Sequence, residues 1–221
     1  MKALYFDCAN GVSGDMVYSA LRELLGEKER SALGAVEKLH IHGQEHGHSH
    51  NSYSDIKKLI EGSKISEGAK KNALSIYSVI AKAESSVHGT SVADVHFHEV
   101  GRVEAIKNIV GAAVCADALG AEKVICSGIN DGRGFIECSH GTIPVPVPAV
   151  MAMRKDCGLV FTTDESVSTE MVTPSGLAIL IGLGASYSKE TPQGKLLKKA
   201  VVYGKRVAGR DGGLTVSLLS L

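Results

Sequence analysis

Short apolar strands alternate with amphipathic helices along this chain of 221 residues, and this alternation constrains the fold more than any other feature. Residues 3–7 (ALYFD) have the pattern of a strand, a glycine-containing turn follows, and apolar residues then recur at helical spacing to Leu25. Further helices are predicted at 27–39, 55–61, 66–87, 101–119 and 174–181, with another that ends at about 154, and further strands at 123–126, 134–138, 159–162, 200–203 and 214–219. The pattern predicts an α/β or α+β fold with one mixed sheet and several packed helices, in one domain over 1–221.

Single residues predict where some of these elements begin and end. Ser54 is expected to cap the helix at 55–61, and Thr173 to cap a helix that has Pro174 in its first turn. Gly89 and Gly120 are expected to end the helices at 66–87 and 101–119. Three prolines follow the strand at 134–138 in close succession, and we expect them to prevent regular strand pairing over that stretch. These prolines are Pro144, Pro146 and Pro148.

The charge balance excludes two classes of partner. Lys plus Arg number 24 and Asp plus Glu number 24, so the chain lacks the basic field that nucleic acids and anionic membranes attract. No apolar run approaches the ~18 residues of a membrane span, and the start of the chain does not resemble a secretory leader. The five cysteines form no CxxC pair, which indicates reduced thiols and a cytoplasmic location.

The histidines are concentrated in one tract, where five of the nine lie between residues 40 and 50. We expect a mobile loop over 40–53, because this stretch has too few aliphatic residues to contribute to a core. Flexible imidazoles suit nickel, copper or zinc, so His42, His46, His48 and His50 are candidates for accessory nickel capture. The alternative is a solvated linker that binds metal only adventitiously.

A second histidine motif, His96-Phe97-His98-Glu99, is the sharpest local signal. In an extended segment the residues at i and i+2 share a face, so His96 and His98 could converge on one metal ion. The helix that follows adds Glu104 on one of its faces. The alternative is a pair of hydrogen-bonded core histidines beside an exposed Glu99.

Three loops offer small residues and backbone N–H groups suited to anions. In the first, Gly11, Ser13 and Gly14 permit close approach of a phosphate, while Asp15 and the preceding Asp7 could hold a cation. The second loop contains His140, and the third opens a helix with Thr173, Ser175 and Gly176. Each loop alone is equally well explained as an ordinary turn.

Taken together, these segments resemble the LarC family of nickel-insertion proteins. The matching segments are YFDC at 5–8, GVSGDM at 11–16, the His tract followed by SDI at 54–56, VHFHEVG at 95–101, IVGAA at 109–113, HGTIPVP at 140–146 and TPSG at 173–176. The resemblance implies that Ni²⁺ is inserted into a pyridinium mononucleotide with two thiocarboxylates, with consumption of CTP and assistance from Mn²⁺ or Mg²⁺. It also implies a CTP-binding C-terminal domain, which we do not find in this chain and expect on a separate partner chain.

The resemblance therefore implies the N-terminal component of a CTP-dependent nickel insertase that is inactive alone, acting on a phosphorylated pyridinium dithiocarboxylate. The alternatives are a nickel carrier or scaffold without turnover, and a metal-dependent hydrolase that uses His96 and His98. Assembly into a homo-oligomer is compatible with each of these functions. We expect the loops at 11–15, 140–141 and 173–176 to converge with His96 and His98 in one cleft. There His98, Glu99 and Glu104 would be catalytic, and His96, His98, Asp7 and Asp15 would hold metal.

Overall fold

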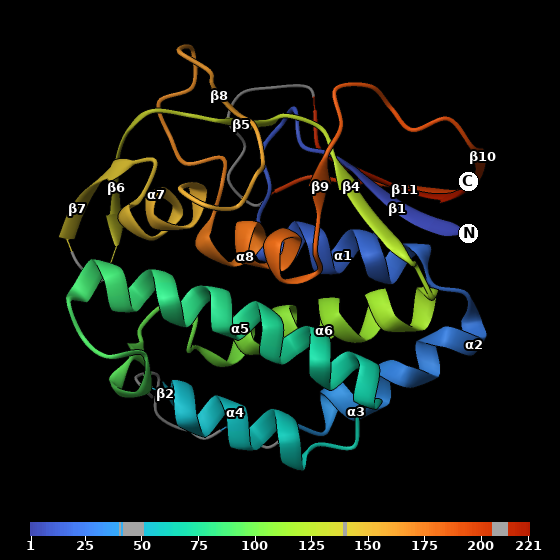
Figure 1. Ribbon diagram of the computed structural model, residues 1–221, viewed down its shortest axis with the longest axis horizontal. Coiled ribbons are helices and arrows are strands. Elements are labelled where there is room, and N and C mark those ends of the chain that lie inside the picture. The colour runs from blue at the N-terminus through green and yellow to red at the C-terminus, as the bar shows by residue number, and fades with distance from the viewer. Residues whose placement is uncertain (40, 42–50, 139–140, 205–211) are drawn as a thin grey trace.

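A mixed five-stranded sheet forms one layer of the protein (Figure 1). The computed structural model describes residues 1–39, 41, 51–138, 141–204 and 212–221. The strand order is β10-β11-β1-β4-β9. Its strands are β1 (Lys2–Asp7), β4 (Lys123–Cys126), β9 (Ser186–Tyr187), β10 (Lys195–Val202) and β11 (Leu214–Ser220). Since β1 pairs parallel with β4 and antiparallel with β11, the predicted mixed sheet is confirmed.

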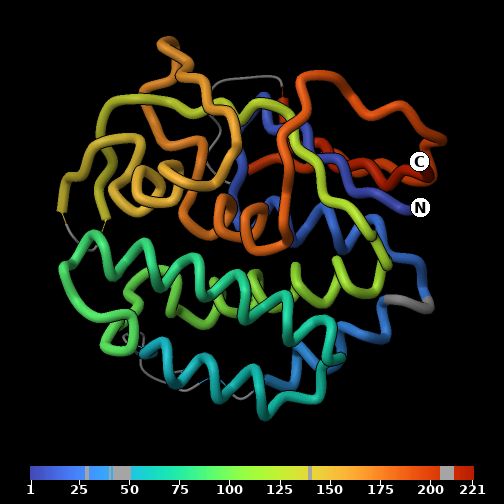
Figure 2. Tube along the Cα trace, in the orientation of Figure 1, coloured from blue at the N-terminus to red at the C-terminus, as the bar shows by residue number. Residues whose placement is uncertain are grey.

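Most of the helices, among them α1, α4, α5 and α6, lie below the sheet in Figures 1 and 2. The helix α1 (Gly14–Leu24) packs against β10 and β11, and α6 (Val103–Leu119) packs against α1. The long helix α5 (Glu67–His88) lies against both α6 and α8 (Pro174–Gly182), while α4 (Tyr53–Gly62) packs on α5. In the described chain no helix is both long and apolar enough to cross a membrane.

The core fills the space between these layers. Leu4 and Phe6, at alternate positions of β1, belong to one buried apolar cluster with the apolar residues of α1 and with Tyr77 of α5. Both Phe6 and Tyr77 are fully buried. Burial raises the pKa of the Tyr77 hydroxyl, because ionisation there would place a charge away from water.

The helix predicted at 27–39 is divided into three short pieces. These are α2 (Glu27–Arg30), the 3-10 turn η1 (Ser31–Leu33) and α3 (Gly34–Glu37). The backbone keeps right-handed helical angles at Arg30 and at Gly34, but tightens between them into 3-10 geometry. Gly34 weakens a continuous helix here, since glycine costs about 1 kcal/mol relative to alanine in a helix interior.

Small two-stranded sheets connect the larger elements. They pair β2 (Asn51–Ser52) with β3 (His96–Phe97), β5 (Ile129–Asp131) with β8 (Phe161–Thr163), and β6 (Gly134–Cys138) with β7 (Gly141–Val145). The expectation that the prolines prevent pairing is wrong for Pro144, which pairs with Phe135 inside β7. The reason is that this hairpin has two strands only, so the N–H that proline lacks is not needed on the outer side of β7.

Most predicted helix ends are confirmed, with one correction. Gly89 and Gly120 end α5 and α6 in the left-handed conformation, and Thr173 caps α8. The cap of α4 is Ser52 and not Ser54: its hydroxyl accepts the Asp55 N–H, and the Asp55 carboxylate accepts the Ser52 N–H. This capping box moves the start of the helix two residues upstream of the predicted one. The remaining elements are η2 (Val92–Asp94) and α7 (Pro148–Arg154).

Candidate functional site

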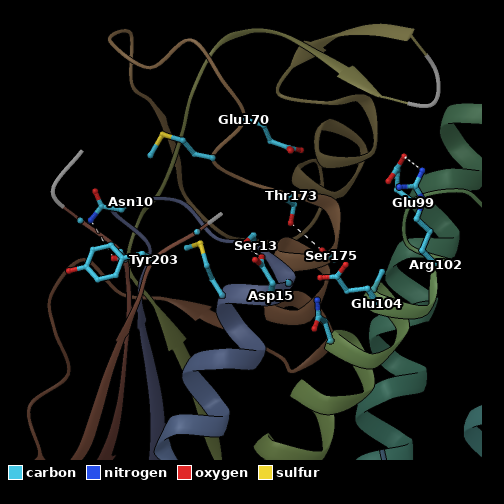
Figure 3. A pocket seen from close by; sticks show the side chains of 18 residues that line it. Asn10, Ser13, Asp15, Glu99, Arg102, Glu104, Glu170, Thr173, Ser175 and Tyr203 are labelled. Carbon is cyan, nitrogen blue, oxygen red and sulfur yellow. Dashed lines mark hydrogen bonds and ion pairs between the residues drawn. The ribbon is translucent and has the colours of Figure 1, made fainter. Parts of the chain in front are cut away.

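A pocket of about 390 Å³ lies where the N-termini of α1, α6 and α8 meet (Figure 3). Its volume falls within the range of about 300–1,000 Å³ typical of small-molecule sites. The lining includes Ser13, Gly14 and Asp15 from α1, Glu99, Arg102, Glu104 and Asn108 from the approach to α6 and its first turns, and Thr173 and Ser175 from the start of α8. Three helix N-termini bring the partial positive charge of their dipoles to this space.

The starts of α1 and α8 are joined directly through their backbones. The Val12 N–H donates to the Met171 carbonyl at 2.9 Å, and the Thr173 N–H donates to the Val12 carbonyl at 3.0 Å. A Cβ atom on Gly176 would lie 2.5 Å from the Val12 carbonyl oxygen, which no side chain tolerates. Gly11, with φ of +80°, turns the chain behind this contact. Gly11 and Gly176 therefore allow the two backbones to approach each other, while Gly14 lines the pocket itself.

Hydroxyl groups hold the loop conformations at this junction. The Ser13 hydroxyl donates to the Asp15 carboxylate at 2.5 Å, and the Thr173 and Ser175 hydroxyl oxygens lie 3.1 Å apart. The Thr173 Oγ1 atom also accepts the Gly176 N–H at 3.2 Å. The side chains that line the pocket are thus positioned by contacts within the turns that carry them.

The charges around the pocket are mixed. Four carboxylates line it, those of Asp15, Glu99, Glu104 and Glu170. Among the lining residues that the structure describes, Arg102 is the one Lys or Arg, and its Nη2 atom lies 3.0 Å from Glu99 Oε1. Both partners are about half exposed, so the pair contributes little to stability and can rearrange around a ligand. A pocket with N–H groups, one guanidinium and several carboxylates suits an anion accompanied by a cation.

A buried carboxylate that sequence analysis missed supports one wall of this pocket. Asp131 is fully buried at the end of β5, and its Oδ1 atom accepts the N–H groups of Met171 and Val172, both at 3.1 Å. Its Oδ2 atom lies 2.6 Å from the Arg154 guanidinium of α7, which stacks over Phe161. Burial lowers the pKa of Arg154, although the Asp131 carboxylate opposes that shift. A single aspartate in a polar strand carries no sequence signal that distinguishes it from a solvated one.

The histidine motif is fixed by its central phenylalanine. Phe97 is fully buried, with its ring 5.8 Å from that of Tyr77 and 6.3 Å from that of Tyr53. A buried amide, that of Asn51, donates to the Gly101 carbonyl at 2.8 Å and holds the turn that follows. Because β3 ends at Phe97, the chain bends at the next residue instead of continuing as a strand.

The structure therefore brings together part of the predicted cleft. The segments at 13–15 and 173–175 line one pocket together with Glu99 and Glu104, as expected for two of the three predicted loops. His96 is exposed on β3, and neither His96 nor His98 belongs to the pocket lining. Asp7 also lies outside the lining, where it accepts the Ala9 N–H at 3.2 Å. His140 and the tract histidines His42, His46, His48 and His50 lie outside the described residues.

No preformed metal cage is found in the part of the chain that the structure describes. There, no group of three or more His, Cys, Asp or Glu side chains is arranged to hold one ion. The buried thiols are poor candidates, because burial raises the pKa of Cys8 well above its ordinary value, and nearby Cys126 and Asp7 raise it further. Burial likewise raises the pKa of Cys126 to about 11, so both stay protonated at neutral pH.

Other lining residues come from the C-terminal part of the chain, which sequence analysis left unassigned. Tyr203, Gly204, Gly212 and Gly213 close one side of the pocket. The Asn10 amide donates to the Gly213 carbonyl at 3.4 Å, and a Cβ atom on Gly212 would lie 2.4 Å from that amide nitrogen. The Gly-Gly pair was the available signal, since adjacent glycines often mark close backbone approach.

Comparison with known proteins gives a consistent result. A family model described as nickel insertion protein matches residues 27–218. The pyridinium-3,5-bisthiocarboxylic acid mononucleotide nickel insertion protein of Acetivibrio thermocellus is 39% identical over 97% of this chain and 59% of its own length. Proteins with the same description from Akkermansia muciniphila and Desulfitobacterium hafniense (strain DCB-2) are 37% and 35% identical, over 83% and 94% of this chain and 52% and 55% of their own lengths.

This chain spans between about half and three fifths of the length of these relatives. No solved structure matches it. The family model covers most of the chain, and the relatives share over a third of its residues, so the family suggested by the sequence motifs is confirmed. The chain belongs to the nickel insertion protein family.

Proposed function

We propose that this chain takes part in inserting nickel into pyridinium-3,5-bisthiocarboxylic acid mononucleotide, the compound named in its relatives, and that the pocket between α1, α6 and α8 binds this mononucleotide. The observation that carries the proposal is the meeting of three helix N-termini beside Arg102 and four carboxylates. A mononucleotide carries a phosphate, which suits N–H groups at helix starts. Nickel is the second substrate, and the carboxylates provide the negative field that a divalent cation needs.

The chemistry of the reactants divides the pocket into two sides. The phosphate fits the side formed by Ser13, Gly14, Thr173 and Ser175, where small residues allow close approach to the main chain. The Ni²⁺ ion fits the side formed by Glu99 and Glu104, where soft thiocarboxylate sulfurs of the mononucleotide could complete its coordination. Carboxylate and imidazole ligands hold nickel less firmly than thiolates do, which suits transfer of the ion to sulfur.

We assign CTP to a separate CTP-binding chain in this proposal. The sequence contains no GxxxxGK[ST] phosphate loop. No step of the reaction is assigned to Mn²⁺ or Mg²⁺ on this chain, because the carboxylates of the pocket are assigned to nickel. The expectation is that the 221-residue protein alone neither binds nor hydrolyses CTP. CTP turnover by the purified chain would contradict this assignment.

A cytoplasmic location agrees with the five free cysteines. A nickel carrier without turnover would also bind Ni²⁺. Product formation in the presence of CTP and the partner chain distinguishes an insertase from such a carrier. The hydrolase alternative needs a third and a fourth ligand beside His96 and His98, and nothing in the described part of the chain supplies them as a group.

The pocket assignment is tested by binding of the mononucleotide to Arg102→Gln. We expect about tenfold weaker binding, because a hydrogen bond to a charged group is worth about 1.5–3 kcal/mol. The matched control is Arg133→Gln, since Arg133 is equally exposed and paired with Glu165, at 3.2 Å, but does not line the pocket. Equal affinity of both variants and the unmodified protein, measured by calorimetry, would show that the mononucleotide binds elsewhere.

A further inference from the structure

The strand β10 forms one edge of the five-stranded sheet. In the order β10-β11-β1-β4-β9 its one neighbour among the described residues is β11. With eight residues, Lys195–Val202, it is also the longest strand that the structure describes. An edge strand presents backbone N–H and C=O groups on its outer side, where a further strand can pair with them. The outer side of β10 is therefore a position at which the sheet can be extended.

Exposed apolar side chains are concentrated along this edge. Leu196 is 53% exposed, Leu197 and Val201 are 42% and 41% exposed, and Tyr203, just beyond the strand, is 69% exposed. These four lie within nine consecutive residues, yet they make up over a third of the large apolar side chains that the described chain exposes. Single exposed apolar residues are common on any surface, whereas a group of them marks an interaction site.

The side chains of β10 point alternately to two faces of the sheet. The Lys198 Nζ atom donates to the Leu24 carbonyl at the end of α1, at 2.7 Å, so Lys198 lies on the face that α1 covers. Ala200, two residues later, shares this face and is buried. Lys199 and Val201 therefore point to the opposite face, and both are exposed.

A β-bulge adds one leucine to the exposed row. The register shifts between Leu196 and Lys198, which pair with adjacent residues of β11. Adjacent strand residues point to opposite faces, so Leu196 lies on the face opposite to Lys198. The face of β10 away from α1 therefore carries an apolar, a basic and an apolar residue in a row, namely Leu196, Lys199 and Val201.

The lysines of β10 determine which strand can pair with this edge. Lys195, Lys198 and Lys199 form no ion pair with the residues that the structure describes, and β10 contains no Asp or Glu. A second copy of β10 would bring three more lysines to the same interface, and like charges across a strand pair are destabilising. Edge lysines are a common protection against such self-pairing. A strand with a carboxylate opposite Lys199 would gain a favourable charge pair instead.

We propose that β10 pairs with an extended segment of a partner protein, in which an acidic residue lies between two apolar residues at alternate positions. The acidic residue would face Lys199, and the apolar residues would face Leu196 and Val201. Main-chain hydrogen bonds along the edge provide affinity in this mode of recognition, and the alternate side chains provide specificity. Tyr203 and Gly204, which follow β10, line the pocket, so one end of the docking site adjoins it. The nearness of the partner to the mononucleotide rests on the proposed function, whereas the docking itself does not.

The probe is a synthetic peptide of sequence Thr-Val-Thr-Glu-Thr-Val-Thr, acetylated and amidated at its ends so that only the glutamate is charged. Its Kd is measured by NMR titration of the 221-residue protein. At a peptide concentration ten times the Kd, hydrogen exchange should slow about tenfold at the β10 amides that do not bond to β11. This protection is specific to strand addition, because contact through side chains alone would leave the outer amides open to solvent.

Reversal of one charge tests the role of Lys199. Lys199→Glu should bind the peptide roughly three- to tenfold more weakly, because an opposite-charge pair across the strands becomes a like-charge pair. A second peptide with lysine in place of glutamate should show the reverse preference and bind the variant more tightly than the unmodified protein. Leu196→Ser should weaken binding of both peptides, since it removes an apolar contact without a change of charge.

Lys123→Glu is the matched control. Lys123 is an exposed lysine of the same sheet, and its replacement changes the net charge equally, but it lies in β4, which pairs with β1 and β9. Absence of protection at β10, or equal losses in Lys199→Glu and Lys123→Glu, would overturn the proposal. So would a dimer of the unmodified protein in sedimentation equilibrium that is lost in Leu196→Ser, because the edge would then belong to a second copy. Thermal unfolding checks the fold of each variant, and Tm should change little because these side chains are exposed. Failure of the protein to bind the mononucleotide would contradict the proposed function but would leave this result standing.

Discussion

Gly14 and Ser175 touch across two helix N-termini that are distant in the sequence: a Cβ atom on Gly14 would lie 2.6 Å from Ser175 Oγ. The same junction brings Gly176 against the backbone of Val12 and Ser13. Two helix starts can approach this closely only where one of them has glycine at the contact. The pocket depends on this approach, since Gly14 and Ser175 both line it.

Gly176→Ala is expected to destabilise the protein by about 1–3 kcal/mol, the usual cost of forcing extra volume into a packed contact. The added methyl would meet the Val12 carbonyl oxygen at 2.5 Å and the Ser13 Cα atom at 2.6 Å, and neither can rotate away. Gly34→Ala is the matched control: Gly34 is also helical, and a Cβ atom there meets nothing within 4 Å. It should stabilise by about 0.5–1 kcal/mol. Urea unfolding of both variants measures the difference, and equal stabilities would contradict the close contact.

The sequence predicted the elements well where periodicity and caps agree. The start of α8 at Pro174, capped by Thr173, and the glycine ends of α5 and α6 are examples, because each depends on local chemistry. Convergence of the loops at 13–15 and 173–175 was predicted from the family motifs and their small residues. By contrast, two contacts depend on how distant segments pack, and a pattern of spacing within one segment cannot predict them. These are the approach of the His88 and His98 rings, whose centroids lie 6.2 Å apart, and the hydrogen bonds from Met171 and Val172 to Asp131.

Removing one partner of the Asp131–Arg154 pair is expected to be strongly destabilising. Arg154→Met leaves the fully buried Asp131 carboxylate without its cation, and losses of this kind cost about 3–5 kcal/mol. Asp131→Asn should also weaken mononucleotide binding, because Asp131 holds the Met171 and Val172 N–H groups behind the pocket wall.

Arg133→Met is the control for the Arg154 variant, since Arg133 forms an exposed ion pair with Glu165 and should change stability by less than about 1 kcal/mol. Chemical denaturation distinguishes the two variants. Similar small losses in both would mean that the buried pair does not contribute as described.

Stability is expected to fall as the pH rises above about 9. Burial raises the pKa of Cys115 to about 12 and that of Cys126 to about 11, whereas an unfolded thiol ionises near 8.5. Between these values the unfolded state has released the proton that the folded state keeps, so each thiol contributes stability below pH 9 that is lost progressively toward its folded pKa. The slope approaches about 1.4 kcal/mol per pH unit for each such thiol.

Denaturant unfolding between pH 8 and 10.5 measures this slope, and Cys115→Ala should make it shallower. Cys138→Ala is the control, because Cys138 is only partly buried. A slope unchanged by Cys115→Ala would show that this thiol ionises as readily in the folded protein as in the unfolded chain.

The carboxylates of the pocket should act on the mononucleotide in opposite senses, depending on nickel. Without Ni²⁺, the exposed Glu104 carboxylate repels the phosphate and thiocarboxylate charges, so Glu104→Gln is expected to bind the mononucleotide several-fold more tightly than the unmodified protein, in proportion to the Coulomb energy at the surface. With Ni²⁺ the order should reverse, because the carboxylate stabilises the cation that accompanies the ligand. Damage to the fold would weaken binding under both conditions, so the change of sign separates an electrostatic role from a structural one.

Asp156→Asn is the control, because Asp156 is an exposed acid that does not line the pocket, and it should alter neither affinity. Calorimetry with and without Ni²⁺ at low and moderate salt measures both effects, and the metal-free gain should shrink as salt screens the repulsion. If Glu104→Gln lowers affinity equally with and without the ion, the carboxylate does not couple nickel to the mononucleotide.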